Sequence, residues 1–452
     1  MNLRRWLAPG IGIKRWLLVV FAGLLLLALA FAHFLRQVTR DLQPDGLPGT
    51  LIDLLTLQFL PFALRGLVAG SVGVALVAVG AYRVVRALMD PLQKGGGDQP
   101  LVELIYQKRF LARGPRIVAI GGGTGLSTLL RGLKEHTSNL TAIVTVADDG
   151  GSSGVLRTGL GIPPVGDIRM CLAALADAEP LMREVLQYRF PGPGDGAEGV
   201  NGADGAAGDA RGLAGHALGN LLIAAVTAVE GGDFEDGVRA MNRILAVRGR
   251  VLPVSSTPLT LHAKLADGSV VDGQSMIMRT NGIERVWVTP DSVLPSAEAL
   301  AAIAEADLIV LGPGSLYTSL LPSLLIPAIR DAILAADAGR VFVCNVATQV
   351  GETAGLDLGG HVEALLAHTG PGLIDAVLAN NTFTAQAPPD WPAEPVRLRW
   401  PPNVAPLPRL VLDDVVDPTN AHHHDPTRLA AALIHVPESE PRSRRRSIGR
   451  TA

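Results

Sequence analysis

Two long apolar stretches lie near the start of the chain. Residues 16–35 include no Lys, Arg, Asp or Glu over 20 positions, which is the length a helix needs to cross a bilayer. Residues 66–82 form a second uncharged stretch of 17, which extends backwards through Arg65, whose long side chain can reach the interface. The pattern predicts transmembrane helices at about 16–35 and 64–84, within an anchor of residues 1–92. A cleaved signal peptide for the first stretch and an interfacial helix for the second are the alternatives.

Basic residues flank both stretches on the same side. They precede the first and follow the second: Arg4, Arg5, Lys14 and Arg15, then Arg83, Arg86 and Lys94. Because cytoplasmic loops carry the excess of positive charge, we expect both ends of the anchor in the cytoplasm and a short external loop at 36–53. The sequence therefore predicts a multi-pass protein of the inner (cytoplasmic) membrane, with the region after the anchor in the cytoplasm.

From residue 116 onward, short apolar runs alternate with helical patterns. Helices are expected at 126–133 and from about 168 to 175. Strands are expected at 117–120, 142–147, 285–288, 308–311, 341–344 and 376–378. Such alternation is typical of βαβ units, so we predict an α/β domain over 116–436, with a mostly parallel sheet and helices on both faces. A linker at 93–115, glycine-rich at its start, joins this domain to the anchor.

Three segments of the chain are expected to lack regular structure. Residues 191–212 consist mainly of Gly, Ala and Asp, with almost no large apolar side chains, so a disordered surface insertion is predicted. Residues 388–408 are proline-rich and expected to be extended. The tail at 437–452 carries five arginines. We expect it to be disordered and solvated, with contact to anionic lipid as the alternative.

The composition narrows the class of protein. The chain is 48% hydrophobic and has a mean hydropathy of +0.31, as membrane segments would give. The formal net charge of −3 argues against a nucleic-acid partner. The two cysteines, Cys171 and Cys344, lie far apart and outside any CxxC pattern. This argues against a disulfide framework or a zinc site and fits a reducing compartment.

Glycine-rich turns follow three of the predicted strands. They are Gly121-Gly122-Gly123-Thr124-Gly125, the segment 148–154, and Gly312-Pro313-Gly314-Ser315. A strand that runs through glycines into a helix lets the backbone approach an anion, which the N–H groups at the helix start then bind. We therefore predict a nucleotide-like ligand, with a tight turn lacking any ligand as the alternative. Leu126 and Thr128 stand where a dinucleotide fingerprint needs glycine, and no P-loop GK[ST] follows, so neither NAD nor ATP is inferred.

Two adjacent acids, Asp148 and Asp149, follow the apolar run at 142–147. Ligands of open α/β sheets bind outside the carboxyl ends of the strands. Carboxylates in that position can hold ribose hydroxyls, a Mg²⁺ ion or a substrate hydroxyl awaiting deprotonation. A solvated Asp-Gly turn is the alternative. Ser152 and Ser153 come next and are candidates for a second anion nest.

Polar residues at other element ends complete the candidate site. Asp167 either caps a helix or faces the ligand, and Arg169 can contact a phosphate. Asn220 lies at the mouth of a helix that begins with glycines, where it binds the ligand or serves backbone packing. Asn345 and Asn380 follow two later strands. In a parallel sheet the carboxyl ends of the strands meet at one edge, so we expect a single crevice.

Three consecutive histidines, His422, His423 and His424, precede Asp425. Consecutive side chains on a loop rarely converge on one ion. We therefore interpret the run as a polar loop that caps a helix at 427–433, and not as a metal site.

Six ordered motifs between residues 116 and 435 resemble the YvcK family, the gluconeogenesis factors. They are IGGGTGL at 120–126, TVADDGGSSG at 145–154, GDIR at 166–169, GHALGN at 215–220, LGPGSLYT at 311–318 and CNVATQ at 344–349. The resemblance implies a Rossmann-like fold, binding of UDP-sugars such as UDP-N-acetylglucosamine, and a role in cell shape and envelope synthesis during growth on gluconeogenic carbon. The family's site residues correspond to Gly122, Gly123, Thr124, Asp148, Asp149, Asn220, Gly314 and Ser315.

That family is similar to CofD, the transferase that joins 2-phospho-L-lactate to the deazaflavin Fo. This chain departs from the plain soluble members in its two predicted membrane helices. The family often places a basic residue just before a His-Asp pair near the end of the chain, where an arginine would contact the diphosphate. Here His423 stands before His424-Asp425, so the resemblance does not supply that arginine contact. A smaller departure is Val165, an extra valine before Gly166.

Two functions follow from these features. The first is a membrane-anchored UDP-sugar-binding regulator for which the sequence establishes no cofactor and leaves Mg²⁺ open. A protein partner in envelope synthesis and self-association are also left open. The second is a CofD-like transferase in which Asp148 and Asp149 bind Mg²⁺ and orient the attacking hydroxyl. A NAD-dependent oxidoreductase ranks third, because the fingerprint glycine is missing.

Overall fold

The computed structural model describes residues 111–176, 180–191, 212–384 and 393–436, with isolated positions between 24 and 71. The chain divides into two units, Met1–Phe110 and Leu111–Ala452. The predicted anchor, apart from those isolated positions, lies outside the described residues, as do the interior of the insertion and the basic tail. Across the described ranges no single helix is long and apolar enough to span a bilayer, while the bent pair Leu316–Leu324 and Pro327–Ala335 meets the criterion jointly.

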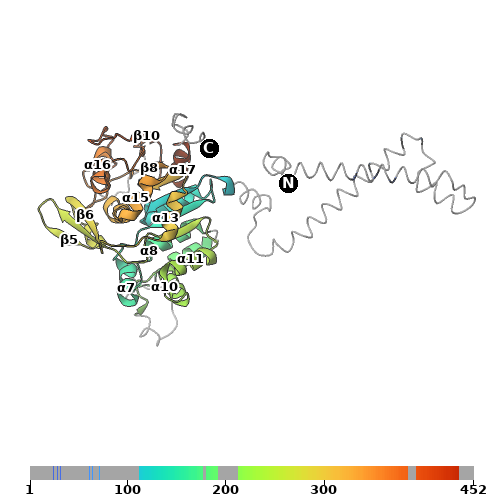
Figure 1. The fold of residues 1–452 in the computed structure, drawn as a ribbon, viewed down its shortest axis with the longest axis horizontal. Coiled ribbons are helices and arrows are strands. Elements are labelled where there is room, and N and C mark those ends of the chain that lie inside the picture. Colours follow the sequence, from blue (N-terminus) through green and yellow to red (C-terminus); the bar gives the residue numbers. More distant parts are fainter. Residues whose placement is uncertain are drawn as a thin grey trace, which may run out of the picture. The chain divides into compact units, whose positions relative to one another are not determined.

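A seven-stranded sheet forms the centre of the second unit (Figure 1). Its order is β10-β9-β8-β7-β1-β2-β3, and all neighbouring strands run parallel. The strands are β1 (Ile117–Gly121), β2 (Leu140–Val144), β3 (Arg250–Pro253), β7 (Leu308–Leu311), β8 (Gly339–Val343), β9 (Ala376–Asn380) and β10 (Arg409–Asp413). The chain adds β2 and β3 on one side of β1, and β7 to β10 on the other. The strand order therefore reverses between β1 and β7, and in sheets of this kind a ligand crevice opens at the point of reversal.

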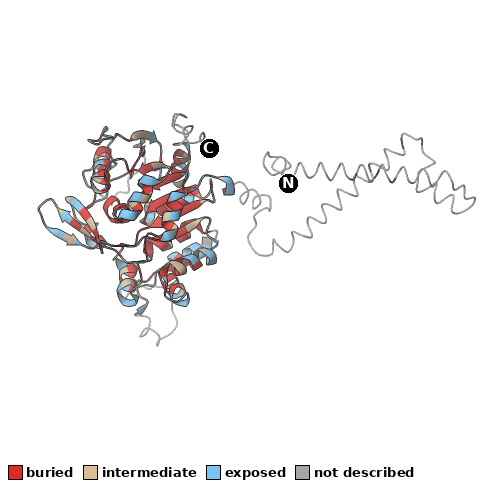
Figure 2. Ribbon diagram, viewed as in Figure 1, coloured by how far each residue is buried: buried red, intermediate tan, exposed pale blue. Residues whose placement is uncertain are grey.

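The burial of the strands explains why their sequences are uninterrupted apolar runs. Every residue of β1, β2 and β9 is buried, as in parallel strands that are covered on both faces. Figure 2 shows this buried centre within the surrounding helices. The longer helices are α6 (Gly123–Leu133), α7 (Gly151–Leu160), α8 (Gly166–Leu175), α9 (Pro180–Gln187), α10 (Leu218–Val229), α11 (Phe234–Ile244), α13 (Ala297–Ala304), α15 (Pro327–Ala335), α16 (Leu358–Thr369) and α17 (Pro426–His435). The predicted α/β fold with a parallel sheet is confirmed.

Several strands differ from the prediction. The strand expected at 285–288 forms as part of β6 (Ile283–Thr289), but it pairs with β4 (Thr260–Leu265) in a separate antiparallel sheet with β5 (Val270–Asp272). Figure 1 shows β5 and β6 at one side of the domain, and β5 and the start of β6 include exposed residues (Figure 2). Buried and partly exposed positions alternate at the start of β4, which is typical of an antiparallel sheet with one solvated face.

The second strand of the parallel sheet is shorter than expected. It ends at Val144 and not at Ala147, so the following six residues form a loop that carries Asp148. Two strands of the same sheet, β3 and β10, were not predicted at all. Both begin with an arginine, and β3 ends at a proline while β10 ends at an aspartate, so their apolar runs are short and interrupted.

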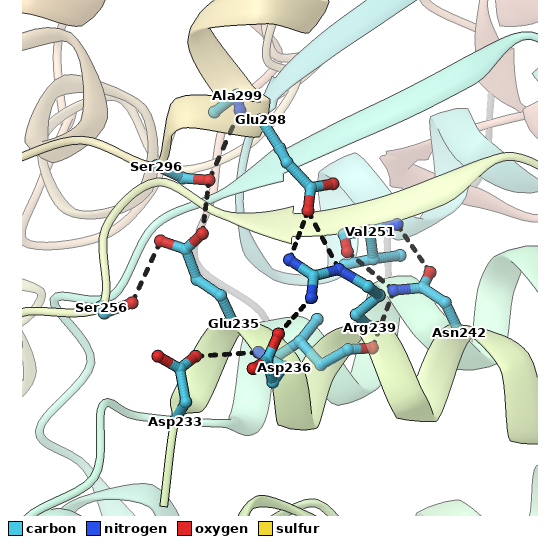
Figure 3. Close-up of polar contacts among 11 residues, drawn as sticks. Asp233, Glu235, Asp236, Arg239, Asn242, Val251, Ser256, Ser296, Glu298 and Ala299 are labelled. Atoms are coloured by element: carbon cyan, nitrogen blue, oxygen red, sulfur yellow. Dashed lines mark hydrogen bonds and ion pairs between the residues drawn. The ribbon is translucent and has the colours of Figure 1, made fainter. Parts of the chain in front are cut away.

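Polar contacts join α11 to the edge of the sheet and to α13 (Figure 3). Asn242 accepts a hydrogen bond from the backbone N–H of Val251 in β3 at 2.8 Å and donates one to its carbonyl at 2.9 Å. Arg239 donates to Glu298 in α13 through Nε at 3.0 Å and also contacts Asp236. The carboxylate of Glu235 accepts from the hydroxyls of Ser256 and Ser296, both at 3.0 Å. The ion pairs of Arg239 are exposed, so they fix the position of α11 more than they add to stability, whereas the bonds of Asn242 are part-buried.

The histidine run lies in a strand and not in the expected loop. His422, His423 and His424 belong to β12 (Asn420–His424), which pairs with β11 (Val416–Asp417). The expected helix cap does form. Asp425 accepts hydrogen bonds from the backbone N–H groups of Thr427 and Arg428, at 2.9 and 2.8 Å, and begins α17.

A close contact between α6 and α17 yields a prediction about stability. A Cβ added at Gly132 would clash with the carbonyl oxygen of Pro426 and stand 2.8 Å from the Cβ of Ala430. We expect Gly132→Ala to lower the free energy of unfolding by about 2 kcal/mol, because a forced extra methyl group in a packed contact typically costs 1–3 kcal/mol. Chemical denaturation followed by circular dichroism measures the change.

The matched control for this prediction is Gly159→Ala in α7. No atom lies within 4 Å of the added Cβ at that position, and alanine is the better helix former. We expect Gly159→Ala to be as stable as the wild type or slightly more so. Equal effects of the two substitutions would contradict the packing described for α6 and α17.

Candidate functional site

A cleft of about 700 Å³ opens where the strand order reverses, outside the carboxyl ends of β1 and β7. Segments that are far apart in the sequence form its walls: 122–128, 148, 167–170, 274–278, 314–319, 345–349 and 420–424. Nine predicted ligand-binding residues meet there: Gly122, Gly123, Thr124, Gly125, Asp148, Asp167, Gly314, Ser315 and Asn345. The single crevice expected from the sequence is therefore present.

The turn after β1 brings bare backbone against three neighbours. A Cβ at Gly122 would collide with the carboxylate of Asp167 and stand 2.9 Å from Cγ2 of Thr145. A Cβ at Gly125 would stand 2.7 Å from the carbonyl oxygen of Pro313. Gly123 has a φ of +67°, a left-handed conformation that favours glycine. Helix α6 begins at this residue, so the positive end of its dipole faces the cleft.

The turn after β7 is held by the side chain of Asn345. The amide oxygen accepts a hydrogen bond from the N–H of Gly314 at 3.1 Å, and the amide nitrogen donates to the carbonyl of Gly314 at 2.9 Å. Asn345 therefore fixes the backbone of this turn, and the N–H of Gly314 is already engaged. Polar groups of this turn that line the cleft include the hydroxyls of Ser315 and Ser319.

Two carboxyl groups share the floor of the cleft. Burial raises the pKa of Asp148, although the N–H of Gly150 donates to it at 2.9 Å. Burial, with the charge of Asp148 adding to it, raises the pKa of Asp167 to about 7, while the N–H of Gly123 and the charge of Arg169 act in the opposite direction. Oδ2 of Asp167 is buried and has no hydrogen-bond partner among the described residues. A ligand that supplies a donor or a cation would satisfy this oxygen.

The adjacent acid Asp149 does not line the cleft. Its Oδ1 accepts a hydrogen bond from the N–H of Ser275 at 2.8 Å, which ties the loop after β2 to the short helix α12 (Gln274–Ile277). The two acids follow one another on an extended loop, so their side chains point in different directions. A site with two carboxyl groups at this position therefore uses Asp148 and Asp167, and not Asp148 and Asp149.

Four other predicted residues make polar contacts outside the cleft lining, and three of them bond to one another. Asn220 accepts from Nε of Arg169 at 2.8 Å and donates to Oγ of Ser152 at 3.0 Å. The hydroxyl of Ser152 also contacts Nδ1 of His216 at 3.0 Å. Ser153 accepts from the N–H of Gly166 at 3.0 Å. These bonds join α7, α8 and α10, and none of the four predicted residues (Ser152, Ser153, Arg169, Asn220) lines the cleft.

The remaining predicted residues support the cleft from behind. Asn380 is buried, and its side-chain oxygen accepts from the N–H of Val415 at 3.3 Å. Gly121 ends β1, and Gly312 follows β7 with a φ of +78°. They shape the two turns without lining the cleft. Asp167 is also not the cap expected for its helix, because Val165 takes that position and Asp167 lies in the first turn of α8.

Several lining residues were missed by sequence reasoning: Thr128, Met170, Gln274, Met278, Ser319, Gln349, Asn420 and the three histidines. His424 is buried, with its Nε2 3.3 Å from the carbonyl oxygen of Cys344, and burial lowers its pKa to about 4. His423 is exposed. Gln349 is the last residue of the CNVATQ motif, and this motif was the signal that could have identified it. Gln274 lies in α12, a helix of four residues that is too short to give a periodic pattern.

The comparisons with known proteins agree with this architecture. Residues 117–391 match the model of the family described as 2-phospho-L-lactate transferase CofD. The chain belongs to this CofD/UPF0052 family. A crystal structure of a UPF0052 family member from Bacillus halodurans is 41% identical, has a TM-score of 0.63, and covers 71% of this chain and 99% of its own.

Relatives of this CofD/UPF0052 protein carry a common name. The gluconeogenesis factor of Bacillus subtilis is 49% identical over 268 residues, which is 59% of this chain and 79% of the relative. A relative from Nostoc sp. is 42% identical over 440 residues, which is 95% of this chain and 91% of the relative. The chain is thus a family member similar to proteins named gluconeogenesis factor.

The raised pKa of Asp167 gives a prediction about pH and stability. A carboxyl group with a pKa of about 7 in the folded protein and near 4 when unfolded contributes stability below pH 4 that is lost as the pH rises towards 7. Asp167→Asn removes this dependence. We expect the stability of the variant relative to the wild type to be on the order of 2 kcal/mol more favourable at pH 8 than at pH 5.

Thermal unfolding of both proteins at the two pH values measures this difference. Comparing variant with wild type at each pH cancels the titration of the groups they share. A variant whose stability relative to wild type is the same at pH 5 and pH 8 would show that Asp167 is ionised normally in the folded protein.

Proposed function

We propose that the protein binds a nucleotide sugar of the UDP-N-acetylglucosamine type in the cleft, as a membrane-anchored regulator of envelope synthesis and cell shape during gluconeogenic growth. The observation that carries the proposal is the meeting of two glycine turns at the switch point of the sheet. The volume of about 700 Å³ lies within the usual range for small-molecule sites. The names of the relatives support the link to gluconeogenic growth.

The charges around the cleft fit a ligand held mainly by neutral groups. Within the described ranges, no Lys or Arg lines the cleft. A diphosphate would therefore rest on the start of α6, on the hydroxyls of Thr124 and Ser319, and on His423. The carboxyl groups of Asp148 and Asp167 would accept hydrogen bonds from sugar or ribose hydroxyls. This division places acceptors beside hydroxyls and donors beside phosphate.

The extent of the alignments supports the membrane anchor. The relatives from Nostoc sp. and Deinococcus radiodurans align with 95% and 97% of this chain, so their similarity reaches into Met1–Phe110. The Bacillus subtilis relative aligns with 59%. We propose that the hydrophobic hairpin predicted for this first unit holds the α/β domain at the cytoplasmic face of the membrane, near a partner in envelope synthesis.

Calorimetry on the purified full-length chain in detergent tests the proposal. We expect heat of binding with UDP-N-acetylglucosamine and none with free N-acetylglucosamine, because the diphosphate provides most of the contacts. Thr124→Val removes an exposed hydroxyl at the start of α6 and should weaken binding roughly 3- to 10-fold, the effect of one lost hydrogen bond.

Thr158→Val is the matched control, since Thr158 is an exposed threonine of α7 that does not line the cleft. It should bind as the wild type does. The proposal fails if no UDP-sugar binds to the wild type, or if both threonine variants lose affinity equally.

The second candidate is a CofD-like transferase, favoured by the family match over 117–391 and by the two carboxyl groups of the cleft. Asp148 and Asp167 would hold Mg²⁺, which would offset charge in the transfer of a phospholactyl group. In the described part of the chain, no three His, Cys, Asp or Glu side chains are grouped to hold a metal, so substrate phosphates would have to complete its coordination.

Incubation of the full-length protein with Mg²⁺, the deazaflavin Fo and an activated 2-phospho-L-lactate donor tests this candidate. Mass spectrometry would detect the joined product. Product formed by the wild type and lost in Asp148→Asn would favour the transferase, whereas UDP-sugar binding without product would favour the regulator.

A further inference from the structure

A buried carboxylate holds the second turn of the cleft from behind. Glu352 is 5% exposed. Its Oε1 accepts hydrogen bonds from the backbone N–H groups of Tyr317 and Thr318, at 2.7 and 2.8 Å, and from the hydroxyl of Thr318 at 3.1 Å. These residues begin the π-helix η3 (Leu316–Leu320), which directly follows Ser315. Glu352 therefore satisfies the free N–H groups at the start of this helix.

The turn that Glu352 anchors also contacts a polar side chain of the cleft. The hydroxyl oxygen of Ser315, directly before η3, accepts a hydrogen bond from Nε2 of Gln349 at 2.7 Å. Because Glu352 holds the backbone of Tyr317 and Thr318, it fixes the position of Ser315 and of the amide that bonds to it.

The amide of Gln349 has a second polar atom that does not face Ser315. Since its nitrogen is directed at Ser315, its Oε1 is directed elsewhere. That oxygen is buried and has no hydrogen-bond partner in the described part of the chain, and Gln349 lines the cleft. One polar atom of this amide is therefore left for a ligand to satisfy.

We infer that Gln349 is a specificity-determining residue of the cleft, whose side-chain oxygen accepts a hydrogen bond from an N–H or O–H group of the ligand. Glu352 is the positioning residue, because it anchors the turn whose Ser315 bonds to this amide. The inference rests on the proposed nucleotide-sugar function and adds to it a residue that recognises the ligand by a hydrogen bond.

Two further acceptors support this reading of the ligand. Oδ2 of Asp167 and Oε1 of Gln274 are also buried without a partner among the described residues, and both side chains line the cleft. A buried acceptor that stays unpaired costs about 1–3 kcal/mol. Three of them in one cleft predict a ligand rich in donors, as the hydroxyls, acetamido N–H and uracil N–H of a nucleotide sugar provide.

The test is the affinity of full-length protein in detergent at pH 8 for UDP-N-acetylglucosamine, measured by calorimetry. Gln349→Met keeps the volume and removes the acceptor, and should weaken binding about 10- to 100-fold. Glu352→Leu removes the acceptor that anchors the turn of Ser315 and should also weaken binding. Glu352→Gln keeps an oxygen for Tyr317 and Thr318 and should restore most of the affinity. Gln187→Met on the exposed face of α9 is the matched control and should bind normally.

Two readouts separate these roles from a general loss of structure. The double variant Gln349→Met/Glu352→Leu should bind no more weakly than Gln349→Met alone, because both changes affect the same contact with the ligand. Analogues of the ligand that each lack one donor include the N3-methyluracil, deoxyribose and deoxysugar forms. For one of these analogues, the wild type and Gln349→Met should bind with equal affinity, because the donor that Gln349 contacts is already missing.

The outcomes distinguish this inference from the function on which it rests. Absence of UDP-sugar binding by the wild type overturns both. Normal binding by the wild type and equal binding by Gln349→Met overturns the role of Gln349 alone. Additive losses in the double variant overturn the positioning role of Glu352 and leave Gln349 in place.

Discussion

The close approach of two backbone turns determines the whole site. Where β1 and β7 end, Gly125 leaves 2.7 Å between a hypothetical Cβ and the carbonyl oxygen of Pro313, and Gly122 lies against the carboxylate of Asp167. Side chains at these positions would push the turns apart and close the cleft. Asn345 then fixes Gly314 through both of its amide atoms. The parallel pairing of β1 with β7 brings the two turns together, so the topology of the sheet and its glycines act as one constraint.

The burial of side chains in this closely packed site determines the electrostatics of the cleft. Burial raises the pKa values of Asp148 and Asp167, and the charge of Asp148 raises that of Asp167 further. His424 is held neutral by its own burial. The described lining thus presents acceptors, hydroxyls and helix-start N–H groups instead of a cluster of fixed cations. A site of this kind selects a ligand by hydrogen bonding more than by net charge, and its unpaired buried acceptors are stable only if a ligand or solvent satisfies them.

The sequence predicts the backbone turns of this site better than the side chains that line it. Both glycine turns and Asn345 could be placed at one sheet edge, because carboxyl ends of parallel strands meet there. Spacing could not decide between Asp148 and Asp149, since neighbours on an extended loop point in different directions. Arg169 and Asn220 carry suitable chemistry but satisfy each other. Gln274 arrives from a four-residue helix in the small antiparallel region, and such long-range placement leaves no periodic signal. The first unit, with its predicted membrane helices, lies outside the described residues.

The most direct test is an experimental structure of the full-length protein with UDP-N-acetylglucosamine bound. The diphosphate should lie between the start of α6 and the turn at Gly314–Ser315, with Asp148 or Asp167 on a sugar or ribose hydroxyl and Oε1 of Gln349 on a ligand donor. A nucleotide sugar bound away from the carboxyl ends of β1 and β7, or a cleft that stays empty at saturating ligand, would contradict the account.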